Sequence, residues 1–251
     1  MKYKFNLLVF IITTYFVLPT NVLALSIDNQ FKGFNGNYLQ LGYSTSNYKH
    51  TDKITNISGS VDLDNNYSIS GGYSYLTGDW NDPGEYETQT VKKISIGVGK
   101  YFPLNSTTDI TSSLMYKDWD ITGTSASTTT NYITNRKPFD LSLYNASIGI
   151  RTLTAADIEL SLQNTWSRLK SSENFKLNYY TPSVGVRNIS DSGLELGLKY
   201  TWFKGDIAIN QIGFELLQHI NESIAIGGRF LSQNGSNADL NERGIFVRRY
   251  F

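Results

Sequence analysis

Cysteine is absent from this 251-residue chain, and proline occurs only five times. Small secreted domains that lack a large hydrophobic core usually depend on disulfides, so a cysteine-free chain must be held together in another way. Scarce proline leaves backbone N–H groups available along most of the sequence, which permits long β-ladders. The formal net charge is zero, so there is no basic field to attract nucleic acid, and we expect no nucleic-acid partner.

Long apolar runs are also lacking after the first two dozen residues. At the N-terminus, Lys2 and Lys4 precede an apolar run from Phe5 to Leu18, and small residues end the segment at Ala24. This order is typical of a secretory signal peptide, because the run is shorter than the roughly 20 residues that a membrane anchor needs. The sequence therefore predicts a cleaved signal peptide over residues 1–24 and an exported domain over residues 25–251.

Aromatic residues and glycine are abundant, with 17 Tyr, 13 Phe, 4 Trp and 21 Gly. The exported part alternates between apolar residues and polar or small ones, which is the period of a β-strand with two different faces. The clearest case lies between Gly193 and Phe203, where one face carries Leu194, Leu196, Leu198, Tyr200 and Trp202. This pattern predicts an all-β chain.

Read consecutively, the alternation predicts about twelve antiparallel strands, at roughly 36–46, 54–63, 67–77, 90–102, 109–120, 139–152, 157–169, 176–188, 193–204, 206–218, 222–232 and 242–251. Two segments change phase, at 139–152 and 206–218, and a β-bulge near Asn145 or Asn210 would restore their alternation. Ten strands remain an alternative. Tight turns alternate with longer polar connections, notably Gly78–Gln89 and Gly123–Pro138, as in an up-and-down transmembrane barrel.

Aromatic residues gather near both ends of the predicted strands, which favours a barrel in lipid over a soluble β-sandwich. One expected girdle, at the outer ends, consists of Tyr43, Tyr75, Trp80, Tyr116, Trp119, Trp166, Tyr179, Tyr200 and Trp202. The other consists of Tyr38, Tyr67, Tyr101, Phe102 and Phe251.

The last segment, from Gly244 to Phe251, resembles the C-terminal strand of Gram-negative outer-membrane β-barrel proteins of the porin-like superfamily. Ile245, Val247 and Phe251 match the alternating pattern that the barrel-insertion machinery reads in that class, whereas Arg249 departs from it. The resemblance implies a location in the bacterial outer membrane, with membrane lipid and the insertion machinery as partners. It names no solute.

If the apolar phase faces lipid, the other phase lines the lumen, and its charges follow an order. Six of them lie near the predicted periplasmic turns: Arg151, Glu159, Arg187, Glu195, Glu215 and Arg248. Across two hairpins we expect Arg151 to oppose Glu159 and Arg187 to oppose Glu195. Lys93, Lys199 and Arg229 lie further toward the outer end, where they would favour anionic solutes.

These charges predict a narrow passive channel for small polar or ionic solutes. The alternative is a structural salt-bridge belt in a non-conducting barrel that engages a surface partner through loops such as Gly123–Pro138. We do not expect an enzyme, because the only histidines, His50 and His219, fall in predicted connections rather than on strand faces. No cofactor or metal site is expected either, since cysteine is absent and the two histidines are far apart in the sequence.

Overall fold

A computed structural model describes residues 37–48, 50–82, 85–127, 132–135, 138–154, 158–190, 192–206, 209–235 and 240–251. The predicted signal peptide at residues 1–24 lies outside the described residues. No described helix is long and apolar enough to cross a membrane.

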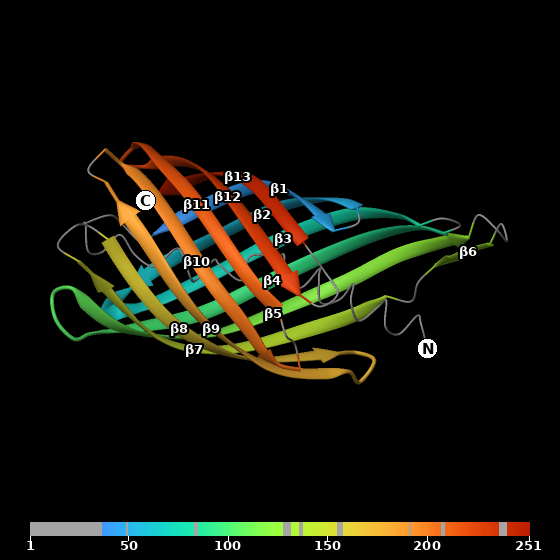
Figure 1. Cartoon of the computed structure of the whole chain (residues 1–251), viewed down its shortest axis with the longest axis horizontal. Helices are drawn as coiled ribbons and strands as arrows, with labels where there is room; N and C mark the ends of the chain where they lie inside the picture. The colour runs from blue at the N-terminus through green and yellow to red at the C-terminus, as the bar shows by residue number, and fades with distance from the viewer. Residues whose placement is uncertain are drawn as a thin grey trace.

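Thirteen antiparallel strands form one sheet, and twelve of them close into a barrel (Figure 1). The ring closes because β13 pairs with β1 and β4 pairs with β5. The strands are β1 (Tyr38–Tyr48), β2 (His50–Leu63), β3 (Tyr67–Asp82), β4 (Glu85–Pro103), β5 (Thr108–Ser127), β6 (Tyr132–Asn135), β7 (Phe139–Leu153), β8 (Ile158–Ser171), β9 (Lys176–Ile189), β10 (Leu194–Gly205), β11 (Ile209–Asn221), β12 (Ile224–Gly235) and β13 (Leu240–Tyr250).

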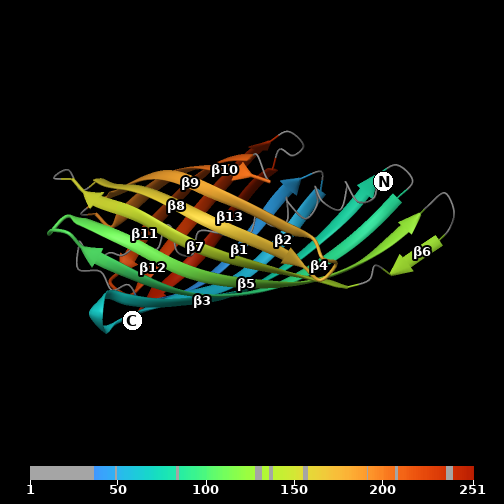
Figure 2. The same ribbon diagram turned by 90° about the horizontal axis from the view of Figure 1, so that it is seen from below.

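The strands are strongly tilted, and the two walls of the barrel cross each other in both views (Figures 1 and 2). The residue register measures this tilt. A row of paired residues that starts at Leu153 of β7 runs once around the ring and returns to β7 at Phe139, a displacement of 14 residues. Such a stagger belongs to a closed barrel whose strands tilt by about 40° from its axis.

The two ends of the barrel differ in the length of their hairpins. At one end, short connections follow β2, β4, β7, β9 and β11, and the pair Tyr38–Tyr250 closes the ring. At the other end the β3–β4 hairpin, β5 and β6 project beyond the remaining strands (Figure 2). Barrels of outer membranes carry short turns on the periplasmic side and long hairpins outside. We therefore call these the periplasmic end and the outer end.

The predicted alternation of faces is present along the strands. Apolar side chains such as Leu41, Ile94, Ile148 and Leu162 are exposed on the outer surface, while their sequence neighbours point into the barrel. The three residues expected to carry the insertion signal, Ile245, Val247 and Phe251, are likewise exposed. A surface with this much exposed apolar area is stable in lipid, and the register leaves the closed ring without a free edge.

Part of the predicted aromatic girdles is wrong. Tyr43, Tyr75, Tyr116 and Trp166 are exposed on the outer surface, as expected. In contrast, four of the predicted members are buried inside the barrel, namely Trp119, Tyr179, Tyr38 and Tyr101. These four side chains point into the barrel. They were assigned to the girdles because they lie near strand ends, although their position in the alternation places them on the inner face.

The structure has twelve barrel strands rather than ten, but it corrects two details of the prediction. The segments Gly78–Gln89 and Gly123–Pro138 are not simple loops, because β3 and β4 continue pairing to Asp82 and Glu85, and β6 pairs with β5. No register shift occurs at Asn145 or at Asn210, so neither predicted bulge exists. The one irregularity among these pairings lies between His219 and Asn221.

Gly227 on β12 marks a point where the inner wall admits no side chain. A Cβ there would lie 2.3 Å from Cζ of Phe246 and 2.8 Å from the carbonyl oxygen of Leu216. Gly227→Ala is therefore expected to lower the free energy of unfolding by about 1–3 kcal/mol, the usual cost of overpacking. Urea unfolding of the barrel folded into lipid vesicles measures this change.

Gly71→Ala provides the matched control, because a Cβ at Gly71 would lie 3.5 Å from its nearest neighbour, the carbonyl oxygen of Ser95. This variant should unfold within about 0.5 kcal/mol of the parent. Equal losses in the two variants would show that glycine is needed for strand formation itself rather than for the contact with Phe246.

Candidate functional site in the barrel lumen

Arg187 is the centre of an ion-pair network near the periplasmic end. Its guanidinium lies 3.2 Å from a carboxylate oxygen of Glu159 on β8 and 3.5 Å from one of Glu195 on β10. All three side chains are buried. Because β9 lies between β8 and β10, one cation bridges two carboxylates across three adjacent strands.

Two further ion pairs continue this periplasmic belt. Arg151 of β7 donates to Asp109 of β5 at 2.5 Å. On the other side of the barrel, Arg248 of β13 lies 3.5 Å from Glu215 of β11 and donates to Gln40 of β1 at 2.8 Å. We call Asp109, Arg151, Glu159, Arg187, Glu195, Glu215 and Arg248 the charge belt; every charge in it has a partner of opposite sign.

The structure brings the six predicted belt residues to the inner wall but corrects their expected opposition. Leu153, not Arg151, lies directly opposite Glu159, and Ile189, not Arg187, lies opposite Glu195. Both hairpins are thus offset by two residues from the predicted register, because each turn lies one residue later in the chain than predicted, with β7 and β9 ending, and β8 and β10 beginning, one residue later. Arg187 still reaches Glu195 along the diagonal, whereas the direct neighbour of Glu159 is Arg187 itself.

The prediction that His219 lies in a turn is wrong. It lies on β11, and its Nε2 is 2.7 Å from a carboxylate oxygen of Glu195. Its ring also stacks on Tyr250, with centroids 5.4 Å apart and an angle of 19° between the planes. The strand continues to Asn221 through the local irregularity, which brings the imidazole into the belt. His50 begins β2, and its side chain lies outside what the structure describes.

On the outer side of the charge belt, the inner wall carries lysines that form no ion pair with any described carboxylate. Lys93 of β4, Lys117 of β5 and Lys199 of β10 point inward, and none of them lies within ion-pair distance of a described carboxylate. Lys199 donates to Gln163 at 3.3 Å, and Lys93 lies 5.7 Å from the ring centroid of Trp119. We call these three residues the lysine group.

Arg229, which the sequence grouped with Lys93 and Lys199, differs from them. Its guanidinium lies 2.6 Å from Glu242 of β13 and 3.2 Å from the hydroxyl of Ser44 on β1. The charge of Arg229 is therefore compensated within the wall, whereas the two lysines of that predicted set have no ion-pair partner among the described carboxylates.

Toward the outer end the inner wall becomes apolar. Inward side chains there form one buried cluster, which we call the inner apolar layer: Ile54, Leu76, Val91, Trp119, Ile121, Phe139, Leu141, Leu143, Leu169, Leu177, Tyr179, Phe203, Ile209 and Leu231. Trp119 is only 1% exposed and lies directly opposite Leu141 in the register. The lumen thus passes from charged to apolar along its axis.

Between the belt and the inner apolar layer lies a small polar cavity of about 60 Å³. Hydroxyl side chains of Ser113, Ser147, Thr165 and Ser183 line it, together with Lys199 and Phe203. Its volume holds on the order of two waters at liquid density. Polar groups at this level can therefore be hydrated without leaving the barrel.

Asp109, Lys117, Glu242 and the inner apolar layer were not predicted from the sequence. Lys117 was readable, because it alternates with the outward Tyr116. The layer also left a signal, since Leu141 and Leu143 are out of phase with Ala146 and Ile148. At this change of phase the apolar side chains of β7 switch from the inner face, at Leu141 and Leu143, to the outer face, at Ile148. No bulge is needed to explain it.

The geometry defines the class: the chain is a closed, twelve-stranded up-and-down β-barrel of the outer-membrane type. No protein-family model matches the sequence. No curated protein matches it either.

Solved structures do resemble it. The NanC porin has a TM-score of 0.60 at 12% identity, and the alignment covers 85% of this chain and 99% of that one. The translocator domain of the autotransporter NalP from Neisseria meningitidis has a TM-score of 0.59 at 9% identity, with 86% and 87% covered. The KdgM porin in complex with disordered oligogalacturonate gives 0.52 at 11% identity, with 84% and 99% covered. At such identities the likeness extends to the fold, which porins and autotransporter barrels share.

Proposed function

We propose that this protein is a narrow passive channel of the bacterial outer membrane for small polar or ionic solutes. The lysine group is the observation that carries the proposal. An ammonium group buried without a counter-charge is strongly unfavourable, so inward lysines without carboxylates call for water or mobile anions around them. A lumen that solutes enter meets this need, whereas a sealed salt-bridge core does not.

The charge belt supports a size limit rather than a charge filter at the periplasmic end. Its cations and carboxylates compensate one another through contacts of 2.5–3.5 Å. A compensated ring narrows the path but presents little net field to an ion. The net positive charge of the pathway would then come from Lys93, Lys117 and Lys199.

The comparisons support transport as the class of function. Among the similar structures are porins, one of them in complex with oligogalacturonate, and the CymD monoaromatic hydrocarbon channel, with a TM-score of 0.53 at 9% identity. Twelve strands enclose more space than eight, whose interior side chains can fill. Oligogalacturonate and monoaromatic hydrocarbons are ligands of those proteins. For this chain we propose only small polar or ionic solutes.

A non-conducting barrel with a surface-interaction role is the second candidate. The inner apolar layer favours it, because a buried cluster at the outer end narrows or closes the path. Autotransporter translocator domains, which share the fold, also show that this architecture is not confined to porins.

Single-channel recording of the purified barrel in planar bilayers decides between the two candidates. The channel predicts discrete conductance steps and, under a salt gradient, a reversal potential on the anion-selective side. The triple variant Lys93→Gln/Lys117→Gln/Lys199→Gln should lower the anion-to-cation permeability ratio by about fivefold or more, since one unit charge acts on an ion 4 Å away with about 1 kcal/mol even in water.

The matched control removes three exposed lysines of the outer surface, Lys53, Lys92 and Lys204, by the same change to glutamine. This control should keep the parent permeability ratio. A correctly folded barrel that gives no steps at all would refute the channel and leave the surface-interaction role.

A further inference from the structure

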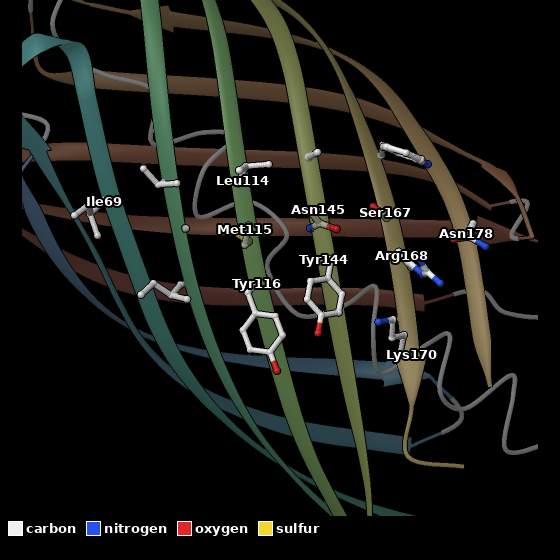
Figure 3. Close-up of a pocket in the computed structure, with 15 residues that line it drawn as sticks. Ile69, Leu114, Met115, Tyr116, Tyr144, Asn145, Ser167, Arg168, Lys170 and Asn178 are labelled. Carbon is white, nitrogen blue, oxygen red and sulfur yellow. The ribbon is translucent and has the colours of Figure 1, made fainter. Parts of the chain in front are cut away.

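The outer wall carries an apolar groove of about 820 Å³ over β4, β5, β7 and β8 (Figure 3). Its floor is the methyl group of Ala146, which the register places in one row between Leu114 and Trp166. Both flanking side chains stand far out from the wall, with exposed fractions of 61% and 69%. A small residue between two large ones leaves an apolar slot on the outer wall.

The next row toward the outer end is polar. The register aligns Tyr116, Tyr144 and Arg168, and Figure 3 shows the two tyrosines and Arg168 on the same side of the wall. Lys170 follows on β8, with Nζ 5.1 Å from the ring centroid of Tyr144. The groove therefore ends at two cations.

These cations are available to a ligand. Neither Arg168 nor Lys170 lies within ion-pair distance of a described carboxylate. The nearby Asp118 instead accepts hydrogen bonds from the hydroxyls of Tyr116, at 3.1 Å, and Ser142, at 3.0 Å. Arginine is well suited to phosphate because its planar guanidinium can donate two parallel hydrogen bonds.

We propose that this groove is a binding site for the phosphorylated, acylated glycolipid of the outer leaflet, lipid A. One acyl chain lies over Ala146 between Leu114 and Trp166, and a phosphate contacts Arg168 and Lys170. The outer leaflet is the source because the cations lie on the outer side of the apolar row, at the level of the exposed tyrosines. The proposal rests on the outer-membrane location, and it holds whether or not the lumen conducts.

Native mass spectrometry of the detergent-purified full-length protein tests this site. The probes are bis-phosphorylated lipid A, the same glycolipid after dephosphorylation, and phosphatidylglycerol. We expect one retained copy of the phosphorylated glycolipid per barrel, and affinity lower by about tenfold or more for the other two probes.

Two variants separate the parts of the site. Arg168→Gln/Lys170→Gln removes the charges and keeps the groove, while Ala146→Phe fills the groove and keeps the charges. Each should weaken binding of the phosphorylated glycolipid by about tenfold. Heat-modifiable gel mobility identical to that of the parent shows that each variant is folded.

The matched controls are Lys53→Gln/Lys204→Gln, which likewise removes two cations, and Thr55→Phe, which likewise adds an aromatic ring, at exposed positions of other strands. They should bind as the parent does. Equal losses in controls and site variants would overturn the proposal, as would equal retention of phosphatidylglycerol, because either result describes unspecific lipid around the barrel.

Discussion

Replacing Arg187 with glutamine is expected to lower the free energy of unfolding by about 3–5 kcal/mol, the cost of removing one partner from a buried ion pair. Arg187 is the cation shared by Glu159 and Glu195, and all three side chains are buried. Without it, Glu159 loses its ion-pair partner, and Glu195 keeps its contact with Nε2 of His219, at 2.7 Å. Two carboxylates facing one lumen also repel each other, which adds to the loss.

Urea unfolding in lipid vesicles, followed by tryptophan fluorescence, measures this change. Arg249→Gln is the control, because Arg249 is exposed on the outer surface. It should stay within about 0.5 kcal/mol of the parent. Adding Glu159→Gln to Arg187→Gln should recover part of the loss, since it removes one of the two orphaned carboxylates. If Arg187→Gln itself unfolds like the parent, water rather than Arg187 stabilises the two carboxylates.

Strand positions were predictable because each strand repeats one local rule. A residue such as Leu196 must face lipid and its neighbour Glu195 must face the lumen, whatever the rest of the chain does. All twelve barrel strands follow from this rule. The ends of the strands did not, because polar segments such as Gly78–Gln89 carry no alternation, yet still pair in the structure.

The partners of the charges were less predictable. The charge belt depends on register, and a shift of two residues moves Arg151 from Glu159 to a position opposite Ser161. No sequence pattern near Arg151 indicates that its partner is Asp109. Asp109 lies 42 residues earlier, on the other strand that neighbours β7. Such contacts are fixed by the closed ring as a whole, and the sequence pattern of a single hairpin does not contain them.

The inner apolar layer shows a different limit of the alternation rule. The rule assumes that an apolar side chain points to lipid, but Leu141 and Leu143 point inward and are buried. Where the barrel projects beyond the membrane, its outer face meets water and its interior can hold an apolar core, as in a soluble protein. A bulge was therefore the wrong explanation for β7. The change of phase marks the level at which the outer face stops contacting lipid and begins to contact water, while the interior becomes apolar.

Trp119→Ala provides the strongest test of what the inner apolar layer does. Trp119 fills the layer from β5 and faces Leu141. Truncation should lower the free energy of unfolding by about 3–5 kcal/mol, the usual cost of removing a buried tryptophan side chain. If the layer constricts the proposed pathway, the same change should roughly double the single-channel conductance, because apolar constrictions oppose the passage of water and ions.

Trp166→Ala is the control, because Trp166 carries the same side chain on the outer wall and is 69% exposed. It should leave the conductance unchanged. A loss of stability in Trp119→Ala with the parent conductance would mean that the pathway does not pass through the layer, which would then be a core and not a constriction. If the parent barrel is silent and Trp119→Ala conducts, the layer is a plug, and the surface-interaction role becomes the better account of the native protein.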